Sequence, residues 1–201
     1  MRHSTVFILA SCLALVCLLN PSDALADVRD KKTIITTNAP LKIPNNTLLP
    51  AGKYVVKLLD SQGTRNIVQI FNERQDKLYA TVLAIPNYRL KPAEETEFTF
   101  WETPAGQAMA LRSWFYPGDT YGVEFTYPKA AATQLARESS KTVPTVYSKS
   151  EKPSELMTAR IGAATSEGKE AELETEVYTA PAEAQNESGE ATTAQSSGET
   201  R

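Results

Sequence analysis

Seven short runs of apolar and β-branched residues follow one another along the chain, with clusters of turn residues between them. Several of these runs alternate apolar and polar positions, which is typical of strands with one buried face. The runs cover residues 32–37, 54–59, 66–71, 78–85, 96–102, 107–116 and 122–127. This pattern predicts an all-β fold, either an antiparallel β-sandwich or a small barrel, with about seven or eight strands.

Turn residues and one change of periodicity divide the chain. Pro50 and Gly52 suit a type I turn, and Pro117-Gly118 suits a type II turn, because glycine readily adopts the positive φ that such a turn needs. After Pro128 the pattern becomes helical over residues 129–138. We therefore assign residues 27–127 to the β-domain and residues 128–149 to a helix and a linker.

The sign of the charge changes near residue 150. Residues 27–149 carry 16 Lys and Arg against 12 Asp and Glu, whereas residues 150–201 carry 4 against 11. The second segment is also rich in Ala, Thr, Ser and Gly, so it offers little apolar surface to offset the entropy of folding. It is predicted to be a disordered acidic tail, acting as a solvating spacer or as a tether to a basic partner.

The first 26 residues predict a secretory signal peptide. Arg2 and His3 precede an apolar run over residues 6–19, and Ala24-Leu25-Ala26 offers a cleavage site before Asp27. Residues 9–12 also resemble a lipoprotein box ending at Cys12, but the apolar run before it is shorter than usual. We expect an exported protein of the periplasm, the cell envelope or the medium, with no transmembrane span in the mature chain.

Cleavage after Ala26 removes the single histidine, His3, and both cysteines, Cys12 and Cys17. The mature chain then lacks the residues of Ser-His-Asp and Cys-His nucleophiles and the usual ligands of zinc. It also lacks a glycine-rich phosphate loop and the acidic ladder of a calcium loop. We expect no metal and no cofactor. Nucleic-acid binding is not expected either, because the basic residues are spread rather than clustered.

Carboxylates are the catalytic groups that remain. Asp119 and Glu124 are the nearest pair that could support a two-carboxylate hydrolase. Glu124 falls on a polar position of an alternating strand, and Asp119 follows a turn glycine, so a structural role is the simpler interpretation. A small hydrolase is kept as the alternative function.

Aromatic residues concentrate between Phe98 and Tyr127. Strand alternation assigns one set to the core: Phe98, Phe100, Met109, Leu111, Phe115, Val123, Phe125 and Tyr127. Trp101, Trp114 and Tyr116 fall on the other faces, with Arg112 beside them. Flat rings edged by charge suit stacking on sugars or holding an extended peptide. We predict that these three rings bind a ligand and that Arg112 is the polar anchor, unless the helix or residues 88–92 cover them.

Four stretches resemble a group of short exported bacterial proteins of unknown function: LPAGKYVVKL at 49–58, IVQIFN at 67–72, LYATVLAIP at 78–86 and WFYPGDTYGVEFTYPK at 114–129. The resemblance implies an envelope or periplasmic β-domain and supplies no catalytic residue. The Leu-Pro-Ala-Gly-x-Tyr opening also resembles strand openings of transthyretin-like and carboxypeptidase-regulatory sandwiches.

These observations predict a non-catalytic, exported binding or structural module of the cell envelope. Its expected partner is a cell-wall polysaccharide or another envelope protein. Two alternatives stay open: the small two-carboxylate hydrolase, and an assembly subunit that pairs through exposed strand edges.

Overall fold

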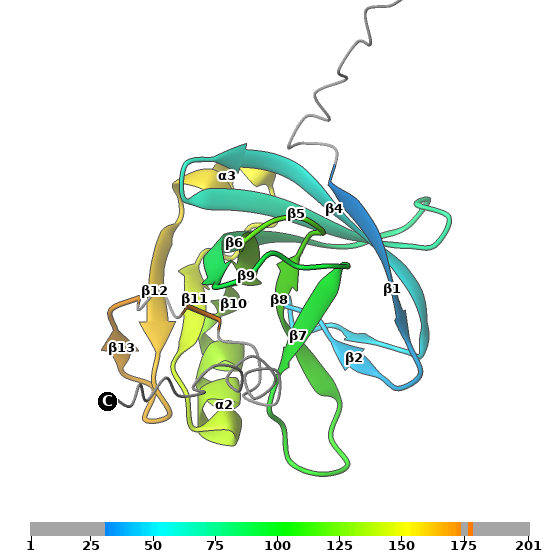
Figure 1. Cartoon of the computed structure of the whole chain (residues 1–201). Helices are drawn as coiled ribbons and strands as arrows, with labels where there is room; N and C mark the ends of the chain where they lie inside the picture. The colour runs from blue at the N-terminus through cyan, green and yellow to red at the C-terminus, as the bar shows by residue number, and fades with distance from the viewer. Residues whose placement is uncertain (1–30, 174–176, 179–201) are drawn as a thin grey trace, which may run out of the picture.

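A computed structural model of the chain describes residues 31–173 and the backbone of residues 177–178. Strands make up most of the described chain and form one large and one small sheet (Figure 1). The predicted all-β class is confirmed. The predicted signal peptide, residues 1–26, lies outside the described residues, as do residues 174–176 and 179–201 of the predicted tail.

The large sheet has ten strands in the order β1-β4-β5-β6-β9-β8-β2-β3, with β7 added to β8 and β14 added to β6. Its longer strands pair antiparallel, as expected, while β2 with β8 and β14 with β6 are short parallel pairs. All seven predicted runs are strands. The bounds are β1 Lys32–Thr37, β2 Leu41–Lys42, β3 Leu48–Leu49, β4 Gly52–Gln62, β5 Arg65–Asn72, β6 Leu78–Arg89, β7 Glu97–Trp101, β8 Met109–Phe115, β9 Tyr121–Phe125 and β14 Val177–Tyr178.

This sheet curls around its own core and forms an open barrel (Figure 1). Alternate side chains of successive strands meet inside it, as the cross-strand pairs Ile35 with Tyr54 and Val68 with Val82 show. The edge strands β1 and β7 approach each other where Thr33 Oγ1 of β1 lies 3.3 Å from Oγ1 of Thr96, the residue just before β7. No backbone pairing joins β1 to β7 among the described strands, so the barrel is closed there by side chains.

The small sheet lies beside the barrel and follows it in sequence. Its order is β10-β11-β12-β13, with bounds β10 Tyr127–Pro128, β11 Val143–Tyr147, β12 Arg160–Ala164 and β13 Glu170–Ala171. Helix α2, Lys129–Ser139, confirms the predicted helix and packs against β11 and β12. Its buried face consists of small residues and one leucine, Leu135, which lets the helix approach the sheet closely.

Residues 150–173 belong to the fold, so the tail cannot begin at residue 150. Helix α3, Pro153–Thr158, places Leu156 against Ile67 and Leu83 on the outer face of the barrel. The linker predicted up to residue 149 likewise contains strand β11. Composition averaged over 150–201 concealed these elements, because their buried residues are mostly alanines such as Ala163 and Ala164. An alanine stabilises a core only where close packing surrounds it, which composition cannot reveal.

Candidate functional site

The four predicted site residues do not form one exposed face. Trp101 and Trp114 are each 3% exposed and belong to the core. Trp114 lies opposite Phe98 in β7 and Val123 in β9, and residues paired across strands share a face of the sheet. The predicted stripe of outward rings is therefore wrong, because the true register places Trp114 on the same, inward face as Phe98 and Val123.

A β-bulge in β8 sets Arg112 apart from this face. The pairing of β7 with β8 shifts between Thr99 and Phe100, which leaves Arg112 as an extra residue in β8. The Arg112 guanidinium lies 4.5 Å from the centre of the Trp101 ring, and its Nε donates to Glu124 Oε1 at 2.9 Å. Arg112 thus forms a largely buried ion pair, and the exposed aromatic surface beside which it was predicted to lie does not form.

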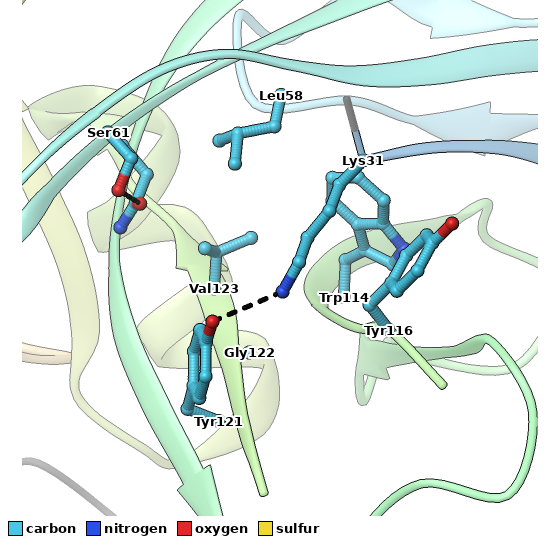
Figure 2. A pocket seen from close by; sticks show the side chains of 9 residues that line it. Lys31, Leu58, Ser61, Trp114, Tyr116, Tyr121, Gly122 and Val123 are labelled. Carbon is cyan, nitrogen blue, oxygen red and sulfur yellow. Dashed lines mark hydrogen bonds between the residues drawn. The ribbon is translucent and has the colours of Figure 1, made fainter. Parts of the chain in front are cut away.

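A pocket opens at one end of the barrel, where β4 turns into β5 and β8 turns into β9. We call it the mouth pocket (Figure 2); it is lined by Lys31, Leu58, Ser61, Asn66, Trp114, Tyr116, Tyr121, Gly122 and Val123. With Lys31 in place, the cavity volume is about 40 Å³, enough for a few water molecules. It unites Trp114 and Tyr116 from the predicted set and excludes Trp101 and Arg112.

The charge in the mouth pocket comes from Lys31, which extends inward between the rings of Tyr116 and Tyr121 (Figure 2). Its Nζ lies 4.6 Å from the centre of the Tyr121 ring and 5.4 Å from that of Tyr116. It donates to the Tyr121 hydroxyl at 3.3 Å and forms an ion pair with Asp119. Burial lowers the pKa of Lys31, but its hydrogen bonds and charge interactions with Asp119 and Tyr121 outweigh burial and raise that pKa above its usual value. Lys31 therefore remains a protonated ammonium at neutral pH.

The indole of Trp114 forms part of the wall of the mouth pocket, and its nitrogen is a buried donor without a partner in the described chain. Its ring stacks on Phe98 with 6.1 Å between centres and meets the edge of Tyr116 at 6.2 Å. Trp114 Nε1 is buried and has no hydrogen-bond acceptor within the described part of the chain, and the same holds for Trp101 Nε1. Leaving a buried donor unpaired costs about 1–3 kcal/mol, so both indoles contribute to the core through their apolar area and not through hydrogen bonds.

The structure does not bring together the two carboxylates of the hydrolase alternative. Asp119 pairs with Lys31 beside the mouth pocket. Glu124 is 6% exposed and accepts hydrogen bonds from Arg112 and from Asn87 Nδ2, the latter at 3.2 Å. A two-carboxylate mechanism needs both groups to face one substrate cleft. No cluster of three His, Cys, Asp or Glu side chains suited to a metal ion occurs in residues 31–173.

Two larger hollows lie elsewhere on the molecule. One, of about 330 Å³, lies between β6 and residues 148–151, where Asn45 Nδ2 donates to Glu151 at 3.2 Å. The other, of about 450 Å³, lies between Arg65, Tyr88 and Arg160. Both are larger than the mouth pocket, but neither combines opposed rings with a charged group between them. The mouth pocket is therefore the stronger candidate.

Lys31 and Tyr121 were not among the predicted site residues, and Asp119 was predicted only as a carboxylate of the alternative hydrolase. Lys31 and Asp119 are separated by 88 positions, so no local pattern links them. Tyr121 follows the turn at Pro117-Gly118 by three residues, and its place beside a turn was the one local sign of an exposed ring.

No known protein family, no curated protein and no solved structure matches this chain. None of the helices within the described residues is both long enough and apolar enough to cross a bilayer.

Proposed function

We propose that this protein is a non-catalytic, exported binding module of the cell envelope, and that its ligand inserts one small group into the mouth pocket. The observation that carries this proposal is the pocket itself, an aromatic recess at the end of a barrel with one ammonium between its rings. Mouths of β-barrels are common binding sites, because the ends of several strands converge there around a preformed cavity.

The size of the mouth pocket limits what enters it. At about 40 Å³ it cannot hold a drug-sized ligand, which needs several hundred Å³. A ligand is therefore expected to insert an end group while the rest contacts the rim, where Tyr121 is 43% exposed. Stacking of sugars on Trp101 and Trp114 has no place in this proposal, since both indoles are buried.

Polar groups in the mouth pocket pair with one another, which favours binding over catalysis. Ser61 Oγ donates to Asn66 Oδ1 at 2.8 Å, and Lys31 pairs with Asp119. Covalent catalysis by a serine needs an adjacent base that takes its proton. The amide oxygen of Asn66 accepts a hydrogen bond but is far too weak a base for that role.

A blocked variant tests the binding site. We expect 1-butanol and n-butylammonium, added as probes to the ¹⁵N-labelled chain, to shift the amide resonances of Gly122 and Val123. Val123→Trp should fill the pocket and abolish these shifts, whereas Ile34→Trp, at a site 57% exposed on β1, should leave them unchanged. Shifts that persist in Val123→Trp, or the absence of saturable shifts with both probes, would refute the proposal.

Proposed export rests on the first 26 residues and has its own test. The full chain, expressed in a bacterium, should appear in the periplasmic fraction with an intact mass that begins at Asp27. Recovery of the uncleaved chain from the cytoplasm would contradict export, and a lipid-modified chain beginning at Cys12 would indicate the lipoprotein alternative.

A second candidate function is assembly through strand edges. It is favoured by the seam between β1 and β7, where each strand has one edge without a backbone partner in the described chain. Such edges can add a strand from another molecule. Light scattering should then show a mass that rises with concentration, and a strict monomer up to millimolar concentration would exclude this function.

A further inference from the structure

The geometry at the mouth pocket points to a specific ligand chemistry. Tyr116, Tyr121 and Asp119 surround the Lys31 ammonium with two ring faces and one carboxylate, and we call these three residues the ammonium cage. Rings of this kind attract cations through the negative charge of their faces, and a carboxylate adds hydrogen bonding and charge. The cage therefore suits a primary ammonium group on an alkyl chain.

The cage is held in place independently of Lys31. Asp119 N donates to Tyr116 O at 3.2 Å, and Ala93 N donates to Asp119 O at 3.1 Å. Gly118, which adopts φ +82°, completes the turn by donating to Ala93 O at 2.8 Å. These backbone bonds fix the cage residues on the turn between β8 and β9, so they need not move when the cation leaves.

Lys31, in contrast, can leave the cage without disturbing the sheet. Its backbone is tied to β4, since Leu58 N donates to Lys31 O at 2.9 Å, but its ammonium sits at the end of a flexible four-carbon stem. Rotation about the bonds of this stem would carry Nζ into solvent. The space that the Lys31 side chain would leave has the shape of an alkylammonium chain, because the Lys31 side chain is itself an alkylammonium.

We infer that the ammonium cage binds a lysine side chain of another envelope protein, and that Lys31 is a built-in competitor which occupies the cage until that ligand displaces it. This inference rests on the proposed function, since it names the group that enters the mouth pocket. The partner segment is lysine-bearing because the chain's own lysine demonstrates the fit.

Competition by Lys31 sets the expected magnitudes. The apparent affinity for a ligand that must displace an occupant equals its intrinsic affinity multiplied by the fraction of molecules in which the cage is open. An ion pair that is partly exposed, together with contacts to two rings, corresponds to roughly a tenfold preference for the occupied state. Removal of the Lys31 side chain should therefore tighten binding of an external ammonium by about tenfold.

The experiment titrates the intact chain with n-butylammonium, with 1-butanol as the uncharged analogue, and with Nα-acetyl-lysine methylamide as a peptide-like probe. We expect saturable binding of both ammonium probes to the wild type, about tenfold tighter binding to Lys31→Ala, and a loss of at least tenfold when Asp119→Asn is added to Lys31→Ala, where no internal competitor is weakened at the same time. Lys53→Ala, which removes an exposed lysine paired with Glu73, is the matched control and should behave as the wild type.

The outcomes separate this inference from the proposed function. If 1-butanol binds as well as n-butylammonium, or if Lys31→Ala does not tighten the binding of the ammonium, the cage assignment is overturned while the mouth pocket remains a binding site. If neither probe binds any variant in a saturable manner, both proposals fail. If Asp119→Asn does not fold, the comparison of the two probes with the wild type still decides the question. A wild type that binds 1-butanol as tightly as n-butylammonium, or more tightly, would exclude the cage.

Discussion

Gly122 is the position at which one added methyl group should disturb both the fold and the mouth pocket. It lies in β9 opposite Phe115 of β8. A Cβ atom at Gly122 would meet Phe115 Cδ1 at 2.5 Å and Trp114 O at 2.5 Å, whereas ordinary contacts begin near 3.4 Å. The Phe115 ring is fully buried and the carbonyl belongs to the neighbouring strand, so neither can move away at small cost.

The expected cost of Gly122→Ala follows from this overlap. Overpacking a buried site costs about 1–3 kcal/mol and occasionally more, and two contacts that are each nearly 1 Å too short place Gly122 at the upper end. The alanine also restricts the unfolded chain, which offsets about 0.4–1 kcal/mol. A net loss of about 2 kcal/mol in the free energy of unfolding corresponds to a fall in Tm of roughly 4–8 °C.

Urea unfolding followed by far-UV circular dichroism measures this loss. Gly52→Ala is the matched control, because a Cβ there would meet only the Tyr54 ring at an ordinary 3.4 Å or more. The control should be neutral or more stable by up to about 1 kcal/mol. If Gly122→Ala unfolds at the same urea concentration as Gly52→Ala, then β8 and β9 do not pair in the register described.

Two further predictions concern the core and the small sheet. Tyr127 is fully buried and its hydroxyl donates to Leu111 O at 2.5 Å, and burial raises its pKa well above the usual value. Because the pKa is raised on folding, the stabilisation is complete below about pH 10, the ordinary pKa of unfolded tyrosine, and is lost as the pH rises further. Tyr127→Phe should therefore cost about 1 kcal/mol at pH 7 and should reduce the loss of stability between pH 7 and pH 10.5, both measured by urea unfolding. A loss between these two pH values that is unchanged in Tyr127→Phe would contradict this. A chain that ends after residue 149 exposes Ile67 and Leu83, which lie under α3. Each large side chain that becomes exposed lowers the free energy of unfolding by about 1.5–3 kcal/mol, so this shortened chain should lose its cooperative thermal transition. A chain that ends after residue 178 should keep that transition.

Most of the strands and helix α2 could be predicted from the sequence because their signals are local. Alternating runs such as β5 and β6 and the turn glycine at Gly118 act over a few residues, and Pro128 marks the start of the helix. Local signals do not determine which residue of one strand faces which residue of the next. The bulge at Arg112 and the register of β8 therefore escaped prediction, and with them the burial of Trp101 and Trp114.

The sequence alone thus determined the class of the fold and the positions of its main strands, since hydrophobic alternation and turn formation depend on residues that are neighbours in the chain. Only the tertiary structure decided where the candidate site lies, because that site is made by contacts across the whole barrel. Lys31 and Asp119 meet only when the first strand and the turn after β8 reach the same end of the curled sheet. Inclusion of residues 150–173 in the fold was decided in the same way, because Leu156 packs on Ile67 and Leu83 of the barrel and β12 pairs with β11.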